Sequence, residues 1–252
     1  MSFYGPANSS MRWKLLVWRG GLAACCLSFV WLVRGFQWNV VWRAAPFLIQ
    51  GLGVSCVLAV VSVAFGMLGG TILAAARLGG VWGVRHIAVA YIEIIRATPQ
   101  LMVIFWVFFT IPALTGQHMA IWEAAIISLS MIASAYLAEV IRAGLQSVPR
   151  VQSESARVTG LNPTQTFVHV LLPQALRNML PALIAHFVMI FKITSLVYVI
   201  GLIDFFRATI IVNNRDLAPY ALYTTMAVVY FGCSYGLSII VRRLDPKYTL
   251  VS

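Results

Sequence analysis

Charged residues are scarce in this chain of 252 residues. They make up 10% of it, and only 7 acidic residues stand against 18 lysines and arginines. Soluble globular domains carry about 25% charged residues, so this scarcity excludes an ordinary soluble domain. Hydrophobic residues make up 61%, and apolar runs recur up to the C-terminus, which excludes a secreted precursor with one short apolar segment. The composition indicates a polytopic membrane protein.

Cysteine, histidine and phosphate-binding patterns give no sign of metal, redox or ATP chemistry. The cysteines lie in apolar runs without metal-ligand spacing, which predicts plain buried thiols: Cys25, Cys26, Cys56 and Cys233. The histidines lack the (i, i+4) spacing of a helical metal site: His86, His118, His169 and His186. No Gly-x-x-x-x-Gly-Lys-Ser/Thr loop and no set of nucleophile, base and orienting acid can be found. We expect no metal, no cofactor, no catalytic residue and no enzyme activity in this chain.

Six segments are apolar and long enough to cross a membrane, for which about 20 residues are needed. They are residues 15–33, 48–73, 86–110, 121–141, 178–200 and 219–241. The predicted fold class is therefore all-α. The first segment is the weakest because it is short and contains Arg19, and whether it crosses the membrane or lies on its surface stays open.

The basic residues follow the positive-inside rule if the N-terminus is cytoplasmic and all six segments cross. The cytoplasmic set is then Arg12, Lys14, Arg19, Arg77, Arg85, Arg142, Arg150, Arg157, Arg177, Arg242, Arg243 and Lys247, and the outer set is Arg34, Arg43, Arg207 and Arg215. Topology thus accounts for most of the net charge of +11, and no nucleic acid partner is expected. The same orientation places the polar stretch 144–175 and both chain ends in the cytoplasm.

The third span is unusual because it contains Glu93, Arg96 and Pro99. Pro99 removes a backbone donor and is predicted to kink or break the helix. Glu93 and Arg96 are three residues apart, so they can form an intrahelical pair that offsets part of their burial cost, or they can line a translocation path. Glu139 and Arg142 have the same spacing near the cytoplasmic end of the fourth span, where we expect them to pair or to anchor the loop.

The polar stretch 144–175 interrupts the apolar runs and has its own helix signals. Residues 149–159 can form one short helix that ends at Gly160, and Asn162 and Pro163 can begin a second. Both short helices are expected to lie along the membrane surface. Small residues, Ser155 and Ala156, would let a partner approach the first helix closely. The alternative is an amphipathic interfacial loop without a partner.

The spacing within this stretch resembles a known family motif. It reads Glu154-Ser155-Ala156, three residues, Gly160, nine residues, Val170, one residue, Leu172-Pro173. This resembles the cytoplasmic coupling loop in the membrane subunits of bacterial ABC importers, whose signature is Glu-Ala-Ala, three residues, Gly, nine residues, Ile, one residue, Leu-Pro. Residues 96–99 and 192–196 resemble the polar amino acid branch of these permeases, and residues 194–207 look most like its glutamate/aspartate permeases.

The resemblance covers residues 46–244 and implies a five-helix permease core with an extra N-terminal helix in residues 1–45 and a cytoplasmic tail at 245–252. It implies a location in the bacterial inner membrane. The implied partners are an ATP-binding-cassette ATPase dimer, a second permease chain that is identical or homologous, a periplasmic amino-acid-binding protein, and membrane lipid. The residues that the resemblance assigns to ATPase coupling are Glu154, Ser155, Ala156, Gly160 and Leu161. The chain departs from the family pattern at Val151, Ser155, Ala185, His186 and Ile193, which weakens any transfer of the family's substrate site.

Lys192 lies about fourteen residues into its span, roughly 20 Å from the cytoplasmic end. An ammonium at that depth needs a partner or water. We predict that it lines the translocation path; the alternative is a lysine that caps backbone carbonyls or reaches outward. The full set of substrate-path candidates is Lys192, Thr194, Ser195, Glu93 and Arg96.

The predicted function is the permease subunit of an ATP-driven importer of polar amino acids, with glutamate or aspartate favoured. Two other functions stay open. A self-sufficient secondary transporter or channel should carry ion-coupling acids within its spans and two related halves, and the sequence offers little evidence of either. A membrane enzyme should carry clustered catalytic residues at one interface, and none can be found.

Overall fold

The structure is a computed structural model that describes residues 34–79 and 81–244, without the side chains of residues 240–244. The expected span at 15–33 lies outside the described residues, as do Cys25, Cys26 and both chain ends. Within the described residues the chain consists of helices joined by short turns and contains no strand. The all-α prediction is confirmed.

Four helical segments in this part of the chain are long and apolar enough to cross a membrane, and a bent pair raises the number to five. The four are Trp38–Leu78, Ile121–Gln146, Pro163–Ile200 and Pro219–Ile239, and the bent pair is Trp82–Ala97 with Gln100–Thr115. Each corresponds to one of the five spans expected between residues 48 and 241. α2 (Trp38–Leu78) begins before the expected domain boundary at residues 45 and 46 and continues through it without a break.

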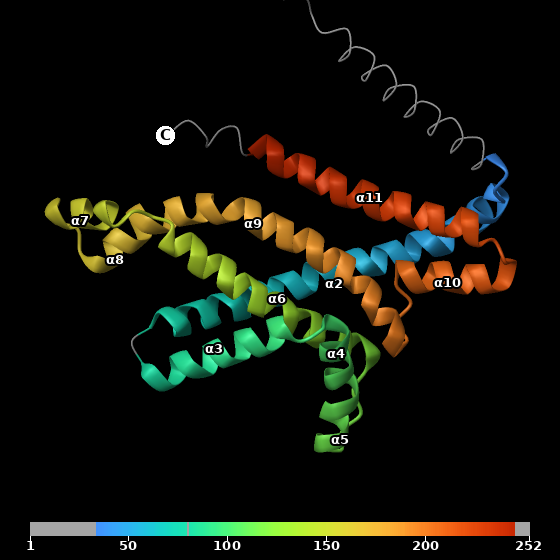
Figure 1. Ribbon diagram of the computed structural model, residues 1–252, viewed down its shortest axis with the longest axis horizontal. Helices are drawn as coiled ribbons and strands as arrows, with labels where there is room; N and C mark the ends of the chain where they lie inside the picture. Colours follow the sequence, from blue (N-terminus) through green and yellow to red (C-terminus); the bar gives the residue numbers. More distant parts are fainter. Residues whose placement is uncertain (1–33, 80, 245–252) are drawn as a thin grey trace, which may run out of the picture.

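The third span is broken at the predicted position. α3 (Trp82–Ala97) ends before Pro99, α4 (Gln100–Phe105) begins after it, and the chain bends there by 112°. A π-helical turn then leads into α5 (Ile111–Thr115), and α4 and α5 turn away from the line of α3 before the chain enters α6 (Figure 1).

The second half of the chain contains α6 (Ile121–Gln146), α7 (Arg150–Val158), α8 (Pro163–Gln165), α9 (Leu172–Ile193), α10 (Phe205–Asp216) and α11 (Pro219–Leu244). The prediction of two separate short helices is wrong for the second. α8 continues through a π-helical turn at Thr166–Leu171 into α9, and a 3-10 turn extends the same segment to Ile200. Pro173 would interrupt a regular α-helix, and the rearranged hydrogen bonds of the π-helical turn directly before it let the helix continue.

The core depends on close packing of α2 against α6. Three glycines of α2 face α6, and a Cβ added at Gly66 would lie 2.4 Å from the Cβ of Ala133. At Gly70 an added Cβ would lie 3.0 Å from the Ala138 amide nitrogen. Small residues let membrane helices approach in this way, where packing rather than the hydrophobic effect drives association.

A buried acid fixes the corner between α9 and α10. Asp204 is fully buried and caps α10, with its Oδ1 accepting a hydrogen bond from the Arg207 amide at 2.9 Å. Ser55 of α2 joins this corner, because its hydroxyl donates to Asp204 Oδ2 at 3.5 Å and accepts from the Phe205 amide at 3.1 Å. α10 is therefore tied to α2 at the end of the bundle opposite α7 (Figure 1).

The prediction of buried thiols is wrong for Cys56, whose side chain is exposed on the surface of the chain. It lies on α2, which packs on α6 and also contacts α3, α9, α10 and α11. Cys233 of α11 is half-buried. Both are free thiols.

Candidate functional site

The segment between α6 and α9 forms a protrusion at one end of the bundle (Figure 1). α7 ends in a Schellman motif, in which the Gly160 amide donates to the Arg157 carbonyl at 3.0 Å and the Leu161 amide donates to the Ala156 carbonyl at 3.2 Å. Gly160 has a φ of +86°, which glycine adopts without steric cost. The predicted helix end at Gly160 is confirmed.

The helix after this turn begins with a capping box. The Asn162 side chain accepts from the Gln165 amide at 2.8 Å, and the Gln165 side chain accepts from the Asn162 amide at 3.0 Å. Pro163 occupies the first helical position, where a missing amide hydrogen costs nothing. The predicted helix start is confirmed, and the turn between α7 and α8 is held at both ends by hydrogen bonds.

One face of α7 is exposed and partly apolar. Val151 is 64% exposed and Val158 is 88% exposed, and Ser155 lies between them on the same face. Glu154 is also exposed. Apolar side chains that form a contiguous exposed patch rimmed by polar residues are typical of a protein contact. Sequence reasoning singled out the small residues here, named Val151 only as a departure from the family pattern, and did not mention Val158.

Ala156 lies on the other face of α7. It is buried and the helix packs there against the turn at Thr166–Leu171. Its carbonyl also accepts a hydrogen bond from the Thr159 hydroxyl at 2.8 Å. The expectation that Ala156 offers a small surface to a partner therefore does not agree with its burial. The small side chain of Ala156 instead lets α7 lie close to the start of the helical segment 163–200.

The protrusion is joined closely to the helices that it connects. A Cβ added at Gly144, in the last turns of α6, would lie 2.8 Å from the Cβ of Met179 in α9. The Asn178 amide of α9 donates to the Ser147 hydroxyl at 2.8 Å, just before α7 begins. Movement of α7 would therefore reach both α6 and α9.

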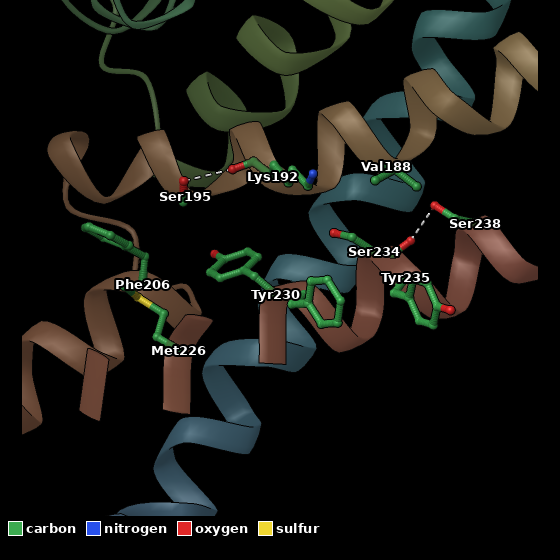
Figure 2. A pocket seen from close by; sticks show the side chains of 10 residues that line it. Val188, Lys192, Ser195, Phe206, Met226, Tyr230, Ser234, Tyr235 and Ser238 are labelled. Atoms are coloured by element: carbon green, nitrogen blue, oxygen red, sulfur yellow. Dashed lines mark hydrogen bonds between the residues drawn. The ribbon is translucent and has the colours of Figure 1, made fainter. Parts of the chain in front are cut away.

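A first cavity of about 600 Å³ lies between α9 and α11 (Figure 2). Its lining includes Lys192 and Ser195 of α9 and the following turn, Phe206 of α10, and Tyr230 and Ser234 of α11. The Lys192 side chain is exposed, and no carboxylate of the described residues forms an ion pair with it. The cavity therefore contains a cationic side chain, Lys192, whose N–H donors are available to a ligand.

Thr194 does not line this cavity. Its side chain is fully buried, and its hydroxyl donates to the Phe191 carbonyl at 2.8 Å. Ser195 does line the cavity, and its hydroxyl donates to the Lys192 carbonyl at 2.8 Å. Successive side chains of a helix point about 100° apart, so these two neighbouring residues face different surroundings.

A second cavity of about 510 Å³ lies between α6 and α9 and reaches Arg96 at the end of α3. Arg96 lies over the ring of Tyr136, 5.7 Å from its centroid, and pairs loosely with Glu93 at 3.9 Å. His186 also lines this cavity with its ring 5.5 Å from Tyr136, and its Nδ1 is buried without a hydrogen-bond partner in the described residues. The sequence marked His186 only as a departure from the family pattern.

The substrate-path candidates thus divide between two cavities on different faces of α9. Lys192 and Ser195 belong to the first, Arg96 belongs to the second, and Glu93 is exposed beside Arg96. Each cavity contains a basic side chain that could bind a carboxylate group, and the second also contains the carboxylate of Glu139, which is paired with Arg77 and Arg142. No three histidines, cysteines or acids among the residues described come together as metal ligands.

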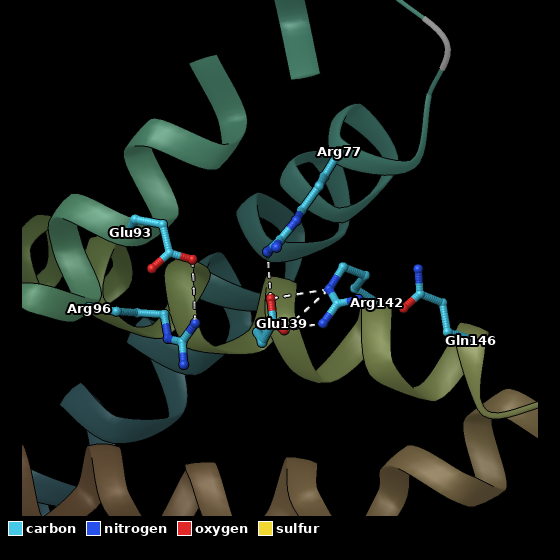
Figure 3. Close-up of polar contacts among 6 residues, drawn as sticks. All are labelled: Arg77, Glu93, Arg96, Glu139, Arg142 and Gln146. Atoms are coloured by element: carbon cyan, nitrogen blue, oxygen red, sulfur yellow. Dashed lines mark hydrogen bonds and ion pairs between the residues drawn. The ribbon is translucent and has the colours of Figure 1, made fainter. Parts of the chain in front are cut away.

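An ionic cluster lies between α2 and α6 (Figure 3). The predicted pair of Glu139 and Arg142 is present, and Arg142 also bonds to Gln146. Arg77 of α2 joins the same carboxylate at 2.5 Å, a contact between residues far apart in the sequence. The cluster ties the end of α2 to α6 shortly before α7.

The model of the family described as binding-protein-dependent transport system inner membrane component matches residues 66–250. The chain belongs to this family. The matched residues include the protrusion and both cavities. Together with the four to five apolar helical segments found among residues 34–244, this makes the chain a multi-pass inner-membrane permease.

Relatives of this permease include two amino acid permeases of similar length. It is 34% identical over 219 residues to the glutamate/aspartate import permease protein GltK of Escherichia coli O6:H1, and the alignment covers 84% of this chain and 98% of the relative. It is also 34% identical over 206 residues to the probable glutamine ABC transporter permease protein GlnP of Bacillus subtilis, and that alignment covers 81% of this chain and 94% of the relative.

The fold of the permease also matches a solved structure. The crystal structure of an amino acid ABC transporter with histidines superposes with a TM-score of 0.79 at 29% identity, covering 84% of this chain and 98% of that chain. The resemblance to ABC importer permeases inferred from the spacing of residues 154–173 is confirmed.

Proposed function

We propose that this permease is the membrane subunit of an ATP-driven importer that moves polar amino acids across the inner membrane, with glutamate or aspartate favoured. The relatives named for glutamate/aspartate and glutamine, and the solved amino acid transporter, support this substrate class. Two cavities that each contain a cation agree with a substrate that carries a carboxylate.

The energy comes from other subunits in this proposal. The sequence has no phosphate-binding loop, so an ATP-binding-cassette ATPase dimer hydrolyses ATP and the permease itself is not an enzyme. A second permease chain, identical or homologous, completes the path, and a periplasmic amino-acid-binding protein delivers the substrate.

The observation that carries the proposal is the exposed stripe of Val151, Ser155 and Val158 on α7. It is the surface we assign to the ATPase, with Glu154 at its edge. Gly160 and Leu161 act by holding the turn, and Ala156 acts by packing α7 on the long helix. Of the coupling residues inferred from the sequence, Glu154, Ser155 and Gly160 are exposed, Leu161 is half-buried and Ala156 is buried.

The continuous helix beyond this stripe suggests how force is transmitted. Residues 163–200 form one helical segment of 38 residues, of which the 22 residues of α9 span about 33 Å at the helical rise of 1.5 Å per residue. A push on α7 moves the start of this rod, and its far end carries Lys192 and Ser195. ATP-dependent movement of the loop would thereby rock the path between inward-facing and outward-facing states.

The substrate path includes both cavities in this proposal. Lys192 and Ser195 line one wall of it, and Arg96, with Glu93 beside it, lines another. Thr194 acts only through the backbone, because its hydroxyl is already bonded. The cationic side chains would bind the carboxylate groups of the substrate.

A paired substitution on exposed valines tests the assignment of α7. Val151→Lys places a charge in the stripe, and Val81→Lys places the same charge on a valine of matched exposure, 66% against 64%, outside α7. The complex with the cognate ATPase, purified in detergent, should lose ATPase subunits with Val151→Lys and keep them with Val81→Lys. Equal retention by the two variants would contradict the assignment.

A transport measurement separates this function from a self-sufficient transporter. Proteoliposomes with the permease alone should show no uptake of labelled glutamate, whereas the complete complex with binding protein and ATP should take it up. Uptake by the permease alone would favour the secondary transporter or channel.

A further inference from the structure

The first turns of α3 are exposed on every side. All residues from Val81 to Ile87 are exposed, although α3 packs against α2 and α6 farther along its length. Four of these exposed side chains are large and apolar: Val81, Trp82, Val84 and Ile87. Trp82 alone is 76% exposed. The start of α3 therefore presents an apolar surface that the described residues do not cover.

The same segment carries positive charge and no acid. Between Arg77 and Glu93 the chain contains Arg85 and His86 and neither aspartate nor glutamate. Arg85 forms no ion pair in the part of the chain that the structure describes. The His86 ring lies 4.3 Å from the Trp82 ring, and its Nδ1 lies 2.7 Å from the Trp82 carbonyl oxygen, which holds the two side chains together. The charge of this surface is complementary to an anion.

An apolar stripe continues from this start along α3. Ile87, Ala90 and Ile94 are three and four residues apart, so they share one face of the helix, and all three are exposed. Ile87 is 73% exposed and Ile94 is 57% exposed. A guanidinium group at one end of an apolar stripe matches a phospholipid, in which a phosphate group is joined to acyl chains.

The position of this surface in the bundle agrees with such a ligand. The start of α3 lies at the same end of the bundle as α7, and α7 extends beyond it (Figure 1). In the orientation predicted from the basic residues, this end faces the cytoplasm. Tryptophan is enriched at the level of the lipid headgroups, and the anionic lipids of the cytoplasmic leaflet attract basic side chains there.

The opposite end of α2 offers a comparison, because Trp42 and Arg43 are also exposed neighbours there. Arg43 lies close enough to Asp216 of α10 for the two charges to interact. The guanidinium group at this end therefore has an acid nearby, whereas Arg85 has none within its segment. The missing countercharge, rather than the presence of an aromatic and a basic side chain, sets the start of α3 apart.

We propose that the start of α3 and its apolar stripe form a binding site for an anionic phospholipid of the cytoplasmic leaflet. Arg85 donates hydrogen bonds to the lipid phosphate, with His86 beside it. Trp82 lies at the level of the headgroup, and an acyl chain lies along Ile87 and Ile94. This site goes beyond the proposed function and does not depend on it.

The lipid would also act on transport through the length of α3. The far end of this helix carries Arg96, which lines the second cavity directly before the bend of 112°. A lipid that holds the start of α3 therefore holds the position of Arg96. We expect anionic lipid to raise the rate of uptake for this reason.

Photocrosslinking with a labelled lipid tests the site in the complete complex. The probe is phosphatidylglycerol with a diazirine in an acyl chain, in nanodiscs of phosphatidylcholine. Irradiation of wild type should give adducts on peptides that contain residues 81–94, and Arg85→Gln should lower their yield several-fold. Arg43→Gln is the matched control, an arginine beside an exposed tryptophan at the other end of the bundle, and should leave the yield unchanged. Arg85→Lys should keep most of it.

A second variant and a second probe complete the test. Val84→Asp places a negative charge beside Arg85, so it should lower the yield as Arg85→Gln does, and it replaces that variant if the latter fails to assemble. Diazirine phosphatidylcholine should label residues 81–94 several-fold less than phosphatidylglycerol. Equal labelling by the two lipids, or by wild type and both variants, would overturn the inference. Adducts that form only after the ATPase is removed would overturn it too, because a protein would then cover the surface.

Uptake of labelled glutamate by the complete complex tests the effect on transport. Wild type should transport several-fold faster in vesicles of phosphatidylcholine with phosphatidylglycerol than in phosphatidylcholine alone, and Arg85→Gln should transport at one rate in both. Equal stimulation of the two proteins would refute the effect of the lipid on transport. If wild type lacked ATP-dependent uptake in both membranes but still gave the phosphatidylglycerol adducts, the proposed function would fail and the lipid site would stand.

Discussion

Substitution of Gly66 by alanine tests whether the bundle depends on the close approach of α2 and α6. The added Cβ would lie 2.4 Å from the Cβ of Ala133, whereas carbon atoms at rest lie about 3.5 to 4.0 Å apart. The two helices would have to separate by more than about 1 Å at their closest point. Neither atom belongs to a flexible side chain, so the strain cannot be relieved by a rotamer change.

The size of the effect follows from two opposed terms. Overpacking of a close contact costs about 1 to 3 kcal/mol. Alanine favours a helix over glycine by up to about 1 kcal/mol. We therefore expect Gly66→Ala to destabilise the protein by about 1 to 2 kcal/mol. At about 2 to 4 °C per kcal/mol for a chain of this size, Tm should fall by several degrees.

The matched control is Gly53→Ala on the same helix, where an added Cβ meets nothing within 4 Å. It should leave Tm unchanged or raise it slightly. Ala133→Gly combined with Gly66→Ala moves the methyl group to the other helix and should recover more than half of the loss. Thermal unfolding in one detergent would compare all four proteins. If Gly66→Ala is as stable as Gly53→Ala, the packing argument is refuted.

Three further predictions concern the site and its supports. Gly160→Val should impair the coupling of transport to ATP turnover, because a β-branched residue is strained at positive φ. Gly160→Asn should retain the coupling, because asparagine tolerates positive φ. Gly116→Val is the control, since it introduces the same strain in a loop outside the protrusion and should leave the coupling intact. Lys192→Met should lose uptake with assembly and basal ATPase intact, and Lys192→Arg should keep part of it, whereas full uptake by the methionine variant would remove Lys192 from the path. Burial raises the pKa of Asp204, which lies outside the membrane-length helices, to about 6. Protonation of Asp204 therefore stabilises the folded protein. This contribution to the free energy of unfolding is complete below about pH 4 and is lost as the pH rises through 6. It amounts to about 3 kcal/mol for a pKa raised by about two units. The Tm of Asp204→Asn relative to wild type should rise over that window, and a constant difference would refute the burial argument.

Local signals in the sequence predicted the elements of the fold well. Pro99 ends a helix because it lacks a donor, and Gly160 ends another because it adopts positive φ, and neither effect needs a distant partner. The pairs Glu93 with Arg96 and Glu139 with Arg142 were predictable for the same reason, since residues three apart share a helix face.

Contacts between distant segments could not be predicted from one sequence. Arg77 meets Glu139 across 62 positions, and no local pattern indicates that contact. Thr194 and Ser195 are neighbouring hydroxyl residues, and the sequence does not tell which of them is buried and which lines the cavity. The continuity of α8 with α9 depends on a π-helical turn that the sequence does not signal.

The central claim is that this permease converts ATP turnover by a partner into amino acid import through the α7 protrusion. The most direct measurement is the uptake of labelled glutamate and aspartate, together with ATP hydrolysis, in proteoliposomes that contain the complete complex and its binding protein. We predict that wild-type complex accumulates substrate only with hydrolysable ATP, and that Gly160→Val retains its subunits but loses uptake. Uptake that persists without ATP, or that is unaffected by the change at Gly160, would contradict the account.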